Sequence, residues 1–149
     1  MSDNPRAVNM IYSGYNKPKD RPVDDELSRV GPGTPAGEYL RRFWHPIMMT
    51  ARLTDKPMAI RILGEDLVLY RDLSGDIGLV HKHCSHRGMS LEYGIVATHG
   101  IRCAYHAWCF NHEGRILETP GEAPGSQIKE RLFHGAYPVL DYKGLIFAY

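Results

Sequence analysis

The chain has 149 residues, of which 43% are hydrophobic and 23% charged, as expected for one modest globular domain. Its 18 Lys and Arg residues nearly balance its 17 Asp and Glu residues, so the net charge of +1 gives no sign of a nucleic-acid or polybasic membrane surface. Three Cys residues exclude a disulfide framework and favour a reducing, cytoplasmic location.

The N-terminal segment is polar and contains prolines. Its first twenty residues lack a continuous apolar run, so neither a signal peptide nor a membrane span is predicted. Met10-Ile11-Tyr12 is its short apolar stretch, which either lies on a neighbouring surface or belongs to an unfolded leader. We expect an irregular arm over residues 1–30 and a single domain over residues 31–149.

A helix is predicted over about residues 35–43. Thr34 supplies an N-cap and Pro35 suits the first helical position. Four large apolar residues then recur at helical spacing: Tyr39, Leu40, Phe43 and Trp44. We expect this apolar stripe to pack into the core.

Short β-prone runs dominate the remainder of the chain. They lie at residues 47–51, 58–63, 67–70, 77–80, 101–102, 108–111, 115–117, 137–140 and 145–149. Gly64-Glu65-Asp66 is predicted to be a hairpin loop, and a second short helix is predicted near residues 127–133. Many short strands with Gly-rich turns predict an all-β sandwich or barrel.

Two short pairs of metal-ligand residues are the most informative feature. They are Cys84-Ser85-His86 and Cys103-Ala104-Tyr105-His106, with sixteen residues between them. Two thiolates and two imidazoles are the ligand set of a Rieske [2Fe-2S] centre, in which two His replace two Cys on one iron. Zinc is the alternative, although common structural zinc sites place paired cysteines before paired histidines.

The residues around these pairs resemble the Rieske domain of aromatic ring-hydroxylating oxygenases. The resemblance lies in Cys84 to Gly88 and Cys103 to Phe110, and residues 30–46 also resemble the N-terminal segment, with its helix, of phthalate and phenoxybenzoate dioxygenase α subunits. Rieske proteins of respiratory and photosynthetic complexes have two further cysteines that form a bracing disulfide. Here Met89 and Tyr105 stand in those places, which indicates the disulfide-free oxygenase type.

The sequence departs from the family pattern at two positions. Ser85 stands where the family usually has proline, and Ala107 where it usually has glycine. Neither change removes a ligand. The Cβ of Ala107 makes a left-handed backbone less favourable at that turn.

The resemblance implies a Rieske-type antiparallel β sandwich with one or two short helices and a two-loop subdomain that binds the cluster. The implied cluster ligands are Cys84, His86, Cys103 and His106. Around them, Tyr105 either donates its hydroxyl to a cysteine sulfur or packs as an aromatic. Ser85 and Arg87 are further candidate donors, and Trp108 is expected to shield the cluster by packing.

The remaining ligand-type residues carry no metal-site prediction. Cys109 is expected to be a buried thiol in a strand. Six histidines lack partners at ligand spacing and are expected to be solvated or hydrogen-bonded: His45, His81, His83, His99, His112 and His134.

No catalytic residue is predicted. Oxygenases of this family hold a mononuclear iron with two histidines and a carboxylate in a separate domain, and no such triad is found in the sequence. The resemblance implies that the chain relays single electrons from a flavin- and ferredoxin-type reductase to that iron, often across a homotrimer interface. We expect the N-terminal part of a longer oxygenase rather than a subunit beside a separate catalytic chain. Alternatives are a stand-alone Rieske carrier and a zinc-binding structural module.

Overall fold

The computed structural model describes residues 24–149. Most of the arm predicted for residues 1–30, including Met10-Ile11-Tyr12, lies outside the described residues. Its described end contains one helical turn, α1 (Asp25–Ser28), because the Asp24 side chain accepts hydrogen bonds from the amides of Glu26 and Leu27. No helix of the described part is long and apolar enough to span a membrane.

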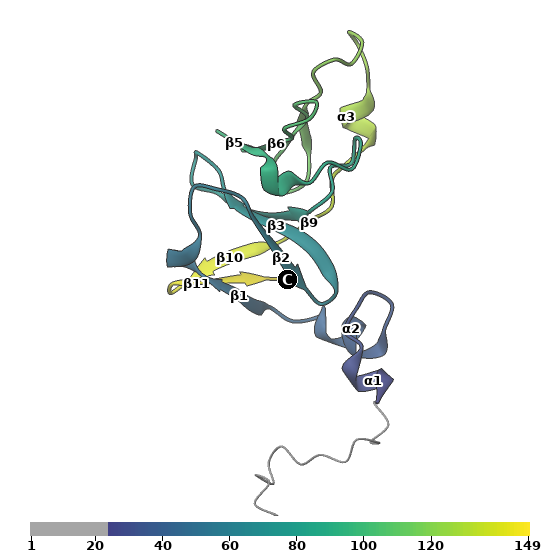
Figure 1. The fold of residues 1–149 in the computed structure, drawn as a ribbon, viewed down its shortest axis with the longest axis vertical. Helices are drawn as coiled ribbons and strands as arrows, with labels where there is room; N and C mark the ends of the chain where they lie inside the picture. Colours follow the sequence, from purple (N-terminus) through teal and green to yellow (C-terminus); the bar gives the residue numbers. More distant parts are fainter. Residues whose placement is uncertain (1–23) are drawn as a thin grey trace, which may run out of the picture.

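Helix α2 (Pro35–Leu40) begins where the sequence predicts but ends early. The Thr34 hydroxyl accepts a hydrogen bond from the amide of Gly37 at 3.2 Å and caps the helix. The predicted core stripe is wrong, because Tyr39, Phe43 and Trp44 are 62%, 47% and 46% exposed. The helix is short and lies beside the edge of the sheets (Figure 1), and the three aromatic side chains remain exposed.

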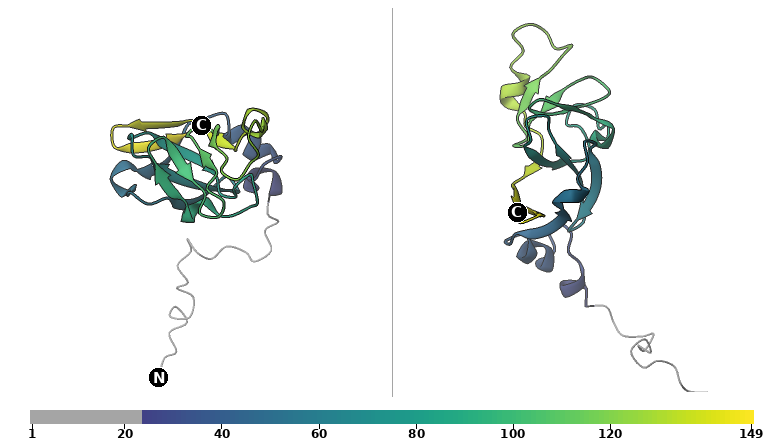
Figure 2. Two further views of the ribbon diagram at one scale, coloured as in Figure 1. Left: turned by 90° about the horizontal axis from the view of Figure 1, so that it is seen from above. Right: turned by 90° about the vertical axis from the view of Figure 1, so that its left-hand side faces the viewer.

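Two antiparallel sheets form the body of the domain (Figures 1 and 2). The first contains β1 (His45–Met49), β11 (Leu145–Ala148) and β10 (Val139–Tyr142) in that order. The second contains β2 (Met58–Ile62), β3 (Glu65–Arg71), β4 (Ile77–His81) and β9 (Ala136–Tyr137). A 3-10 turn at Thr50–Arg52 ends the first strand earlier than predicted.

Strand β3 is the centre of the fold because both of its faces are buried. Leu67 and Leu69 pack into the core between the two sheets, while Val68 and Tyr70 pack into a second core on the opposite face. Successive side chains of a strand point to opposite faces, so one continuous apolar run serves two cores.

The hairpin between β2 and β3 corrects the predicted loop Gly64-Glu65-Asp66. Ile62 pairs with Glu65, so the turn consists of Leu63 and Gly64 alone. Both have positive φ, at 46° and 82°, as a two-residue hairpin turn of right-handed twist requires. Glu65 and Asp66 therefore belong to β3.

A third antiparallel sheet forms the subdomain at the top of Figure 1. Its strands are β5 (Ile95–Ala97), β6 (Gly100–Arg102), β7 (Cys109–Phe110) and β8 (Ile116–Glu118), with the 3-10 turn Leu91–Tyr93 and α3 (Ile128–Arg131) beside them. β5 was not predicted. The predicted strand 137–140 is divided at Pro138 between two sheets, because proline has no amide to donate to a ladder. The all-β antiparallel fold class is confirmed.

Candidate metal centre

The two predicted ligand pairs lie on loops that share one backbone geometry. We call residues 84–89 the first ligand loop and residues 103–108 the second. In each, the cysteine amide donates to the carbonyl five residues later, Cys84 to Met89 at 2.9 Å and Cys103 to Trp108 at 2.8 Å. The residue four positions after each cysteine donates back to the cysteine carbonyl, at 2.8 Å and 3.0 Å. The chain thus builds the same turn twice.

Each ligand loop contains one residue in the left-handed region at the same place. Gly88 has φ of 74° and Ala107 has φ of 58°. The sequence identified Ala107 as the position where a side chain would be costly, and the structure confirms the left-handed backbone there. An alanine in this region costs about 1 kcal/mol relative to glycine.

The two cysteine side chains are buried next to each other. Cys84 and Cys103 are each 3% exposed. Burial, together with the neighbouring Cys103 thiol, raises the pKa of Cys84 to about 11, although the backbone amides of His86 and Arg87 act in the opposite direction. No cationic side chain is among the groups that shift the pKa of Cys84. A metal that bound the two adjacent thiols would convert them to thiolates.

The two histidine rings lie together nearer the surface. The centroids of His86 and His106 are 4.7 Å apart with an interplanar angle of 66°, and both residues are half-buried. His86 also stacks on Trp108, with centroids 4.5 Å apart and planes within 2° of parallel. The loops therefore separate the predicted ligands into a buried thiol pair and a more exposed imidazole pair.

Charged side chains flank both ligand loops, and one of them is bonded to the second loop. Beside the first, Lys82 pairs with Glu92 at 3.2 Å. Beside the second, the Arg102 guanidinium donates to the Ala107 carbonyl at 3.0 Å and to Glu118 at 2.8 Å. The sequence did not single out these four residues, because their contacts depend on tertiary positions and carry no spacing signal.

The arrangement fits a two-iron cluster better than a single ion. Among residues 24–149, no three His, Cys, Asp or Glu side chains converge on one point as a single-metal site. Each iron of a Rieske cluster takes only two protein ligands, a thiol pair or an imidazole pair. The buried indole Nε1 of Trp108 also has no partner in the described chain, and a cluster sulfur would supply an acceptor.

The other candidates around the ligand loops are exposed. Ser85 and Arg87 both face solvent, and Tyr105 is 61% exposed with its ring 3.7 Å from that of His106. The predicted bond from the Tyr105 hydroxyl to a cysteine sulfur stays a prediction. Cys109 is buried in β7, and burial raises the pKa of its thiol.

Three of the remaining histidines have rings that are hydrogen-bonded to backbone carbonyls. His45 bonds the Leu40 carbonyl at 2.7 Å, and His83 bonds the Gly88 carbonyl at 3.0 Å and so steadies the first ligand loop. The buried ring of His134 bonds the His81 carbonyl at 2.8 Å, and burial lowers its pKa to about 4. These contacts agree with the predicted structural roles.

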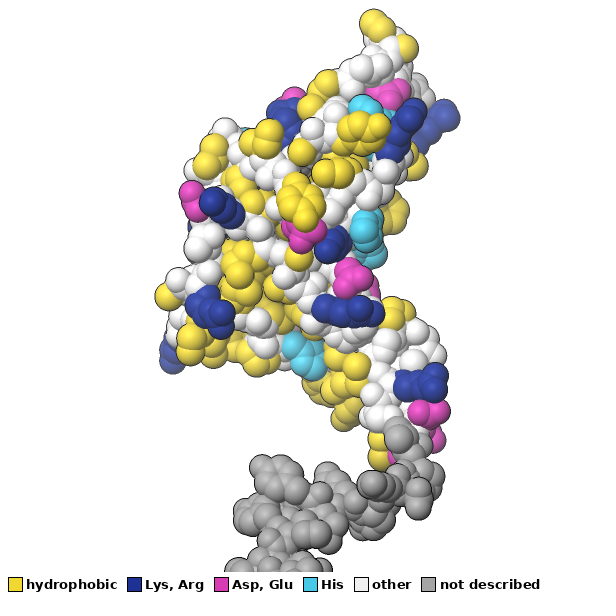
Figure 3. Space-filling model, in the orientation of Figure 1, with side chains coloured by type: hydrophobic (Ala, Val, Ile, Leu, Met, Phe, Trp, Pro, Cys, Tyr) yellow, Lys and Arg dark blue, Asp and Glu magenta, His cyan; other side chains and the backbone are white. Residues whose placement is uncertain are grey.

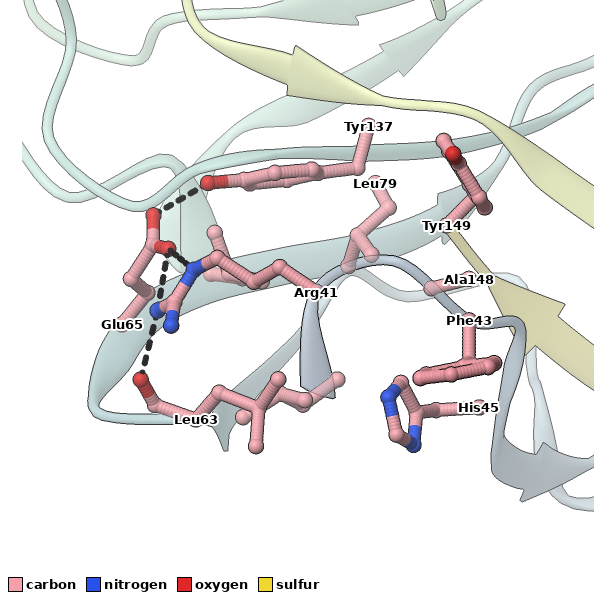
Figure 4. A pocket seen from close by; sticks show the side chains of 11 residues that line it. Arg41, Phe43, His45, Leu63, Glu65, Leu79, Tyr137, Ala148 and Tyr149 are labelled. Atoms are coloured by element: carbon pink, nitrogen blue, oxygen red, sulfur yellow. Dashed lines mark hydrogen bonds and ion pairs between the residues drawn. The ribbon is translucent and has the colours of Figure 1, made fainter. Parts of the chain in front are cut away.

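A separate pocket lies between the β2–β3 hairpin, the residues after α2 and the end of β11 (Figure 4). Arg41 and Glu65 form its polar wall through contacts of 2.8 Å and 3.2 Å, and the Tyr137 hydroxyl donates to the same carboxylate. Burial opposes ionisation of Glu65, but the hydrogen bonds from Tyr137 and Arg41 outweigh it and lower the pKa of Glu65. The cavity has about 40 Å³, far below the roughly 300–1,000 Å³ of small-molecule sites.

Comparison with known proteins places these features in a family. The Rieske [2Fe-2S] domain model matches residues 43–138. The chain is 51% identical over 141 residues to the tert-butanol monooxygenase/tert-amyl alcohol desaturase oxygenase subunit of Aquincola tertiaricarbonis, covering 93% of this chain and 30% of that protein. It is also 51% identical over 126 residues to phenoxybenzoate dioxygenase subunit alpha of Ectopseudomonas oleovorans, covering 85% and 31%.

A solved structure supports the same assignment. The oxygenase and ferredoxin complex of carbazole 1,9a-dioxygenase matches with a TM-score of 0.61 and 30% identity, covering 71% of this chain and 28% of that chain. The chain thus spans about a third of the length of these relatives, and its match includes both ligand loops. On the combined evidence of the fold, the ligand loops and the family model, the chain belongs to the Rieske [2Fe-2S] domain family.

Proposed function

We propose that residues 31–149 form the electron-transfer domain of a larger non-haem iron oxygenase, with a [2Fe-2S] cluster bound by Cys84, His86, Cys103 and His106. The observation that carries the proposal is the division of these residues into a buried thiol pair and a half-buried imidazole pair on two matching loops. When bound, the cluster supplies a one-electron redox couple.

The unequal burial of the two pairs supports a direction for electron exchange. The thiols are enclosed by the core, whereas the rings of His86 and His106 reach the surface. The imidazole end therefore presents the shortest route for an electron to a partner protein. We assign electron entry and exit to this end.

The electron donor that we propose is a reductase of the flavin- and ferredoxin-containing type. Support comes from the carbazole 1,9a-dioxygenase structure, which is a complex of an oxygenase with a ferredoxin. We propose a homotrimer for the full-length protein, and a cytoplasmic location, which suits a chain whose three cysteines form no disulfide with one another.

The proposed electron acceptor is the mononuclear iron of a catalytic domain. Four exposed aromatic residues near α2 and the end of β11 form a surface that we call the aromatic patch: Tyr39, Phe43, Trp44 and Tyr149. Hydrophobic side chains are also visible over the body of the domain in Figure 3. Contiguous exposed apolar side chains are typical of interaction surfaces, so we propose that the catalytic domain covers this patch.

We propose that substrate oxidation takes place in that catalytic domain and not in this one. The pocket of Figure 4 is too small for an aromatic substrate, and its charged wall is already satisfied by internal bonds. An aromatic or related compound is the substrate class that we propose, since one relative is named for phenoxybenzoate. A stand-alone Rieske carrier is the second candidate, supported by the self-contained fold of the cluster subdomain and its core.

Absorption and EPR spectra of the purified protein, before and after dithionite reduction, test the proposal. We expect a coloured oxidised protein and a Rieske-type EPR signal after reduction, with two irons per chain. A colourless, EPR-silent protein with stoichiometric zinc would overturn it. Electron transfer to an added oxygenase catalytic domain then separates the oxygenase relay from the stand-alone carrier.

A further inference from the structure

The His86 ring lies flat on the Trp108 indole, although the two residues come from different ligand loops. Their centroids are 4.5 Å apart and their planes differ by 2°. Trp108 is 1% exposed, and its carbonyl accepts a hydrogen bond from the Cys103 amide at 2.8 Å. The indole is therefore held by the core on one side and supports a predicted cluster ligand on the other.

Neither imidazole of the pair is oriented by a hydrogen bond within the described chain. Histidines that bind metals almost always donate their second ring N–H to a carboxylate or carbonyl, which fixes the plane of the ring. Within residues 24–149, the rings of His86 and His106 have no such partner, in contrast to His45, His83 and His134. Among the described residues, the contacts that support these two rings are aromatic stacks.

The two ligand loops also differ in what supports each ring. The fifth residue after the cysteine is Met89 in the first loop and Trp108 in the second, although the backbone hydrogen bonds are the same. Trp108 backs the histidine of the other loop, whereas His106 rests on its exposed neighbour Tyr105. His86 therefore has a rigid, buried support and His106 a solvent-exposed one.

We infer that Trp108 is a positioning residue that fixes the plane of the His86 imidazole and joins the two ligand loops through an aromatic stack. The inference rests on the proposed cluster function and goes beyond a shielding role for Trp108. Met89 and Tyr105 cannot form a disulfide between the loops, so this stack provides a non-covalent connection in that region. It also makes the two imidazole ligands inequivalent.

Trp108→Leu and Trp108→Phe, compared with Tyr105→Leu, test the inference in the cluster-loaded protein. Leucine removes the aromatic face, whereas phenylalanine keeps a face and removes only part of the ring. Tyr105→Leu is the matched control, because it removes the ring beside His106 and leaves the His86 stack intact. Pulsed EPR of the reduced protein measures the nitrogen couplings of the two imidazoles, and iron release to a chelator measures how firmly the loops hold the cluster.

We expect Trp108→Leu to change one nitrogen coupling and to release iron about tenfold faster, or to lose the cluster altogether. Substitution of residues that support metal ligands typically weakens metal binding by about this factor or more. Trp108→Phe should keep both wild-type couplings, and Tyr105→Leu should affect only the other nitrogen. Wild-type couplings in Trp108→Leu, or equal disturbance in Trp108→Phe and Trp108→Leu, would overturn the inference. A wild-type protein without a Rieske signal would instead contradict the proposed function.

Discussion

The ligand-loop end and the Arg41–Glu65 end of the domain both place polar groups in partly or fully buried surroundings, but only one of them is complete by itself. At the Arg41–Glu65 end, the guanidinium donates to Glu65 and to the carbonyls of Val30 and Leu63, and the carboxylate also accepts from Tyr137. Every charge has a partner supplied by the chain. Such a site has its polar groups satisfied internally and needs no ligand.

At the ligand-loop end, several polar groups have no hydrogen-bond partner within the described chain. Two buried thiols lie side by side, two imidazoles touch without hydrogen bonds to the described chain, and the Trp108 indole N–H has no acceptor there. Because buried polar groups in native proteins are usually paired, these groups are available to bind a further partner. The polar groups of a structural network are thus paired within the chain, whereas those of a binding site are left for a ligand.

Cys84→Ser should give the largest effect at the ligand-loop end. Removal of one thiolate from a pair that holds one iron should abolish the cluster, so iron and sulfide content fall to background and the visible absorption disappears. Cys109→Ala is the matched control, since Cys109 is equally buried but lies in β7 outside the ligand set. Retention of a full cluster in Cys84→Ser, or its loss in Cys109→Ala, would contradict the assignment.

Arg41→Met tests the opposite end and should act on stability alone. The substitution leaves the Glu65 carboxylate, whose side chain is 18% exposed, without its cation, so we expect the free energy of unfolding to fall by about 3 kcal/mol. The EPR spectrum should not change. Arg61→Met provides the control, because its pair with Asp66 is exposed and 3.7 Å long and should contribute less than about 1 kcal/mol. An equal decrease in the free energy of unfolding in both variants would contradict the expected difference between the buried and the exposed ion pair.

The sequence predicted the ligand-loop end much better than the Arg41–Glu65 end. Cysteine and histidine at fixed spacing are local signals, and the left-handed residue at Ala107 follows from the same short motif. The Arg41–Glu65 contact joins a helix end to a hairpin, and Glu65 was assigned to a loop because the two-residue turn Leu63-Gly64 has no Asn-Gly or Asp-Gly signature. Long-range pairing of this kind leaves no local pattern.

The aromatic residues show a second limit of sequence reasoning. Helical spacing correctly placed Phe43 close to Tyr39, but spacing cannot say whether a partner domain or the chain's own core covers these rings. The strand predicted at residues 67–70 is confirmed within β3, where its continuous apolar run is buried on both faces. Patterns thus predicted which residues are apolar neighbours better than what they pack against.

His134 lies between the two ends and should make stability depend on pH. Burial lowers its pKa to about 4, so the unfolded chain takes up a proton below about pH 6.5 while the folded chain does not. The contribution of the neutral His134 ring to the free energy of unfolding is fully present above about pH 6.5. It is lost as the pH falls toward 4. The loss between pH 7 and pH 5 should be about 2 kcal/mol.

His134→Gln removes this titration and keeps a donor for the His81 carbonyl. Urea unfolding at both pH values, in wild type and variant, isolates the effect, because His81, Glu65 and the cluster are common to both proteins. Between pH 7 and pH 5, we expect the free energy of unfolding of His134→Gln to fall by about 2 kcal/mol less than that of the wild type. Parallel pH curves for the two proteins would show that His134 does not titrate in this range.

The smallest contrast lies within the ligand-loop end, between two aromatic donors. The Trp108 N–H is buried without an acceptor in the described chain, whereas the Tyr105 ring is 61% exposed. Hydrogen bonds to cluster sulfurs raise the reduction potential because they stabilise the added negative charge. Voltammetry should therefore find a lower potential in Trp108→Phe and almost no change in Tyr105→Phe, whose hydroxyl water already solvates. A clear decrease of the reduction potential in Tyr105→Phe, with none in Trp108→Phe, would show that Tyr105 and not Trp108 donates to a cluster sulfur. The buried indole N–H of Trp108 would then have no part in setting the potential.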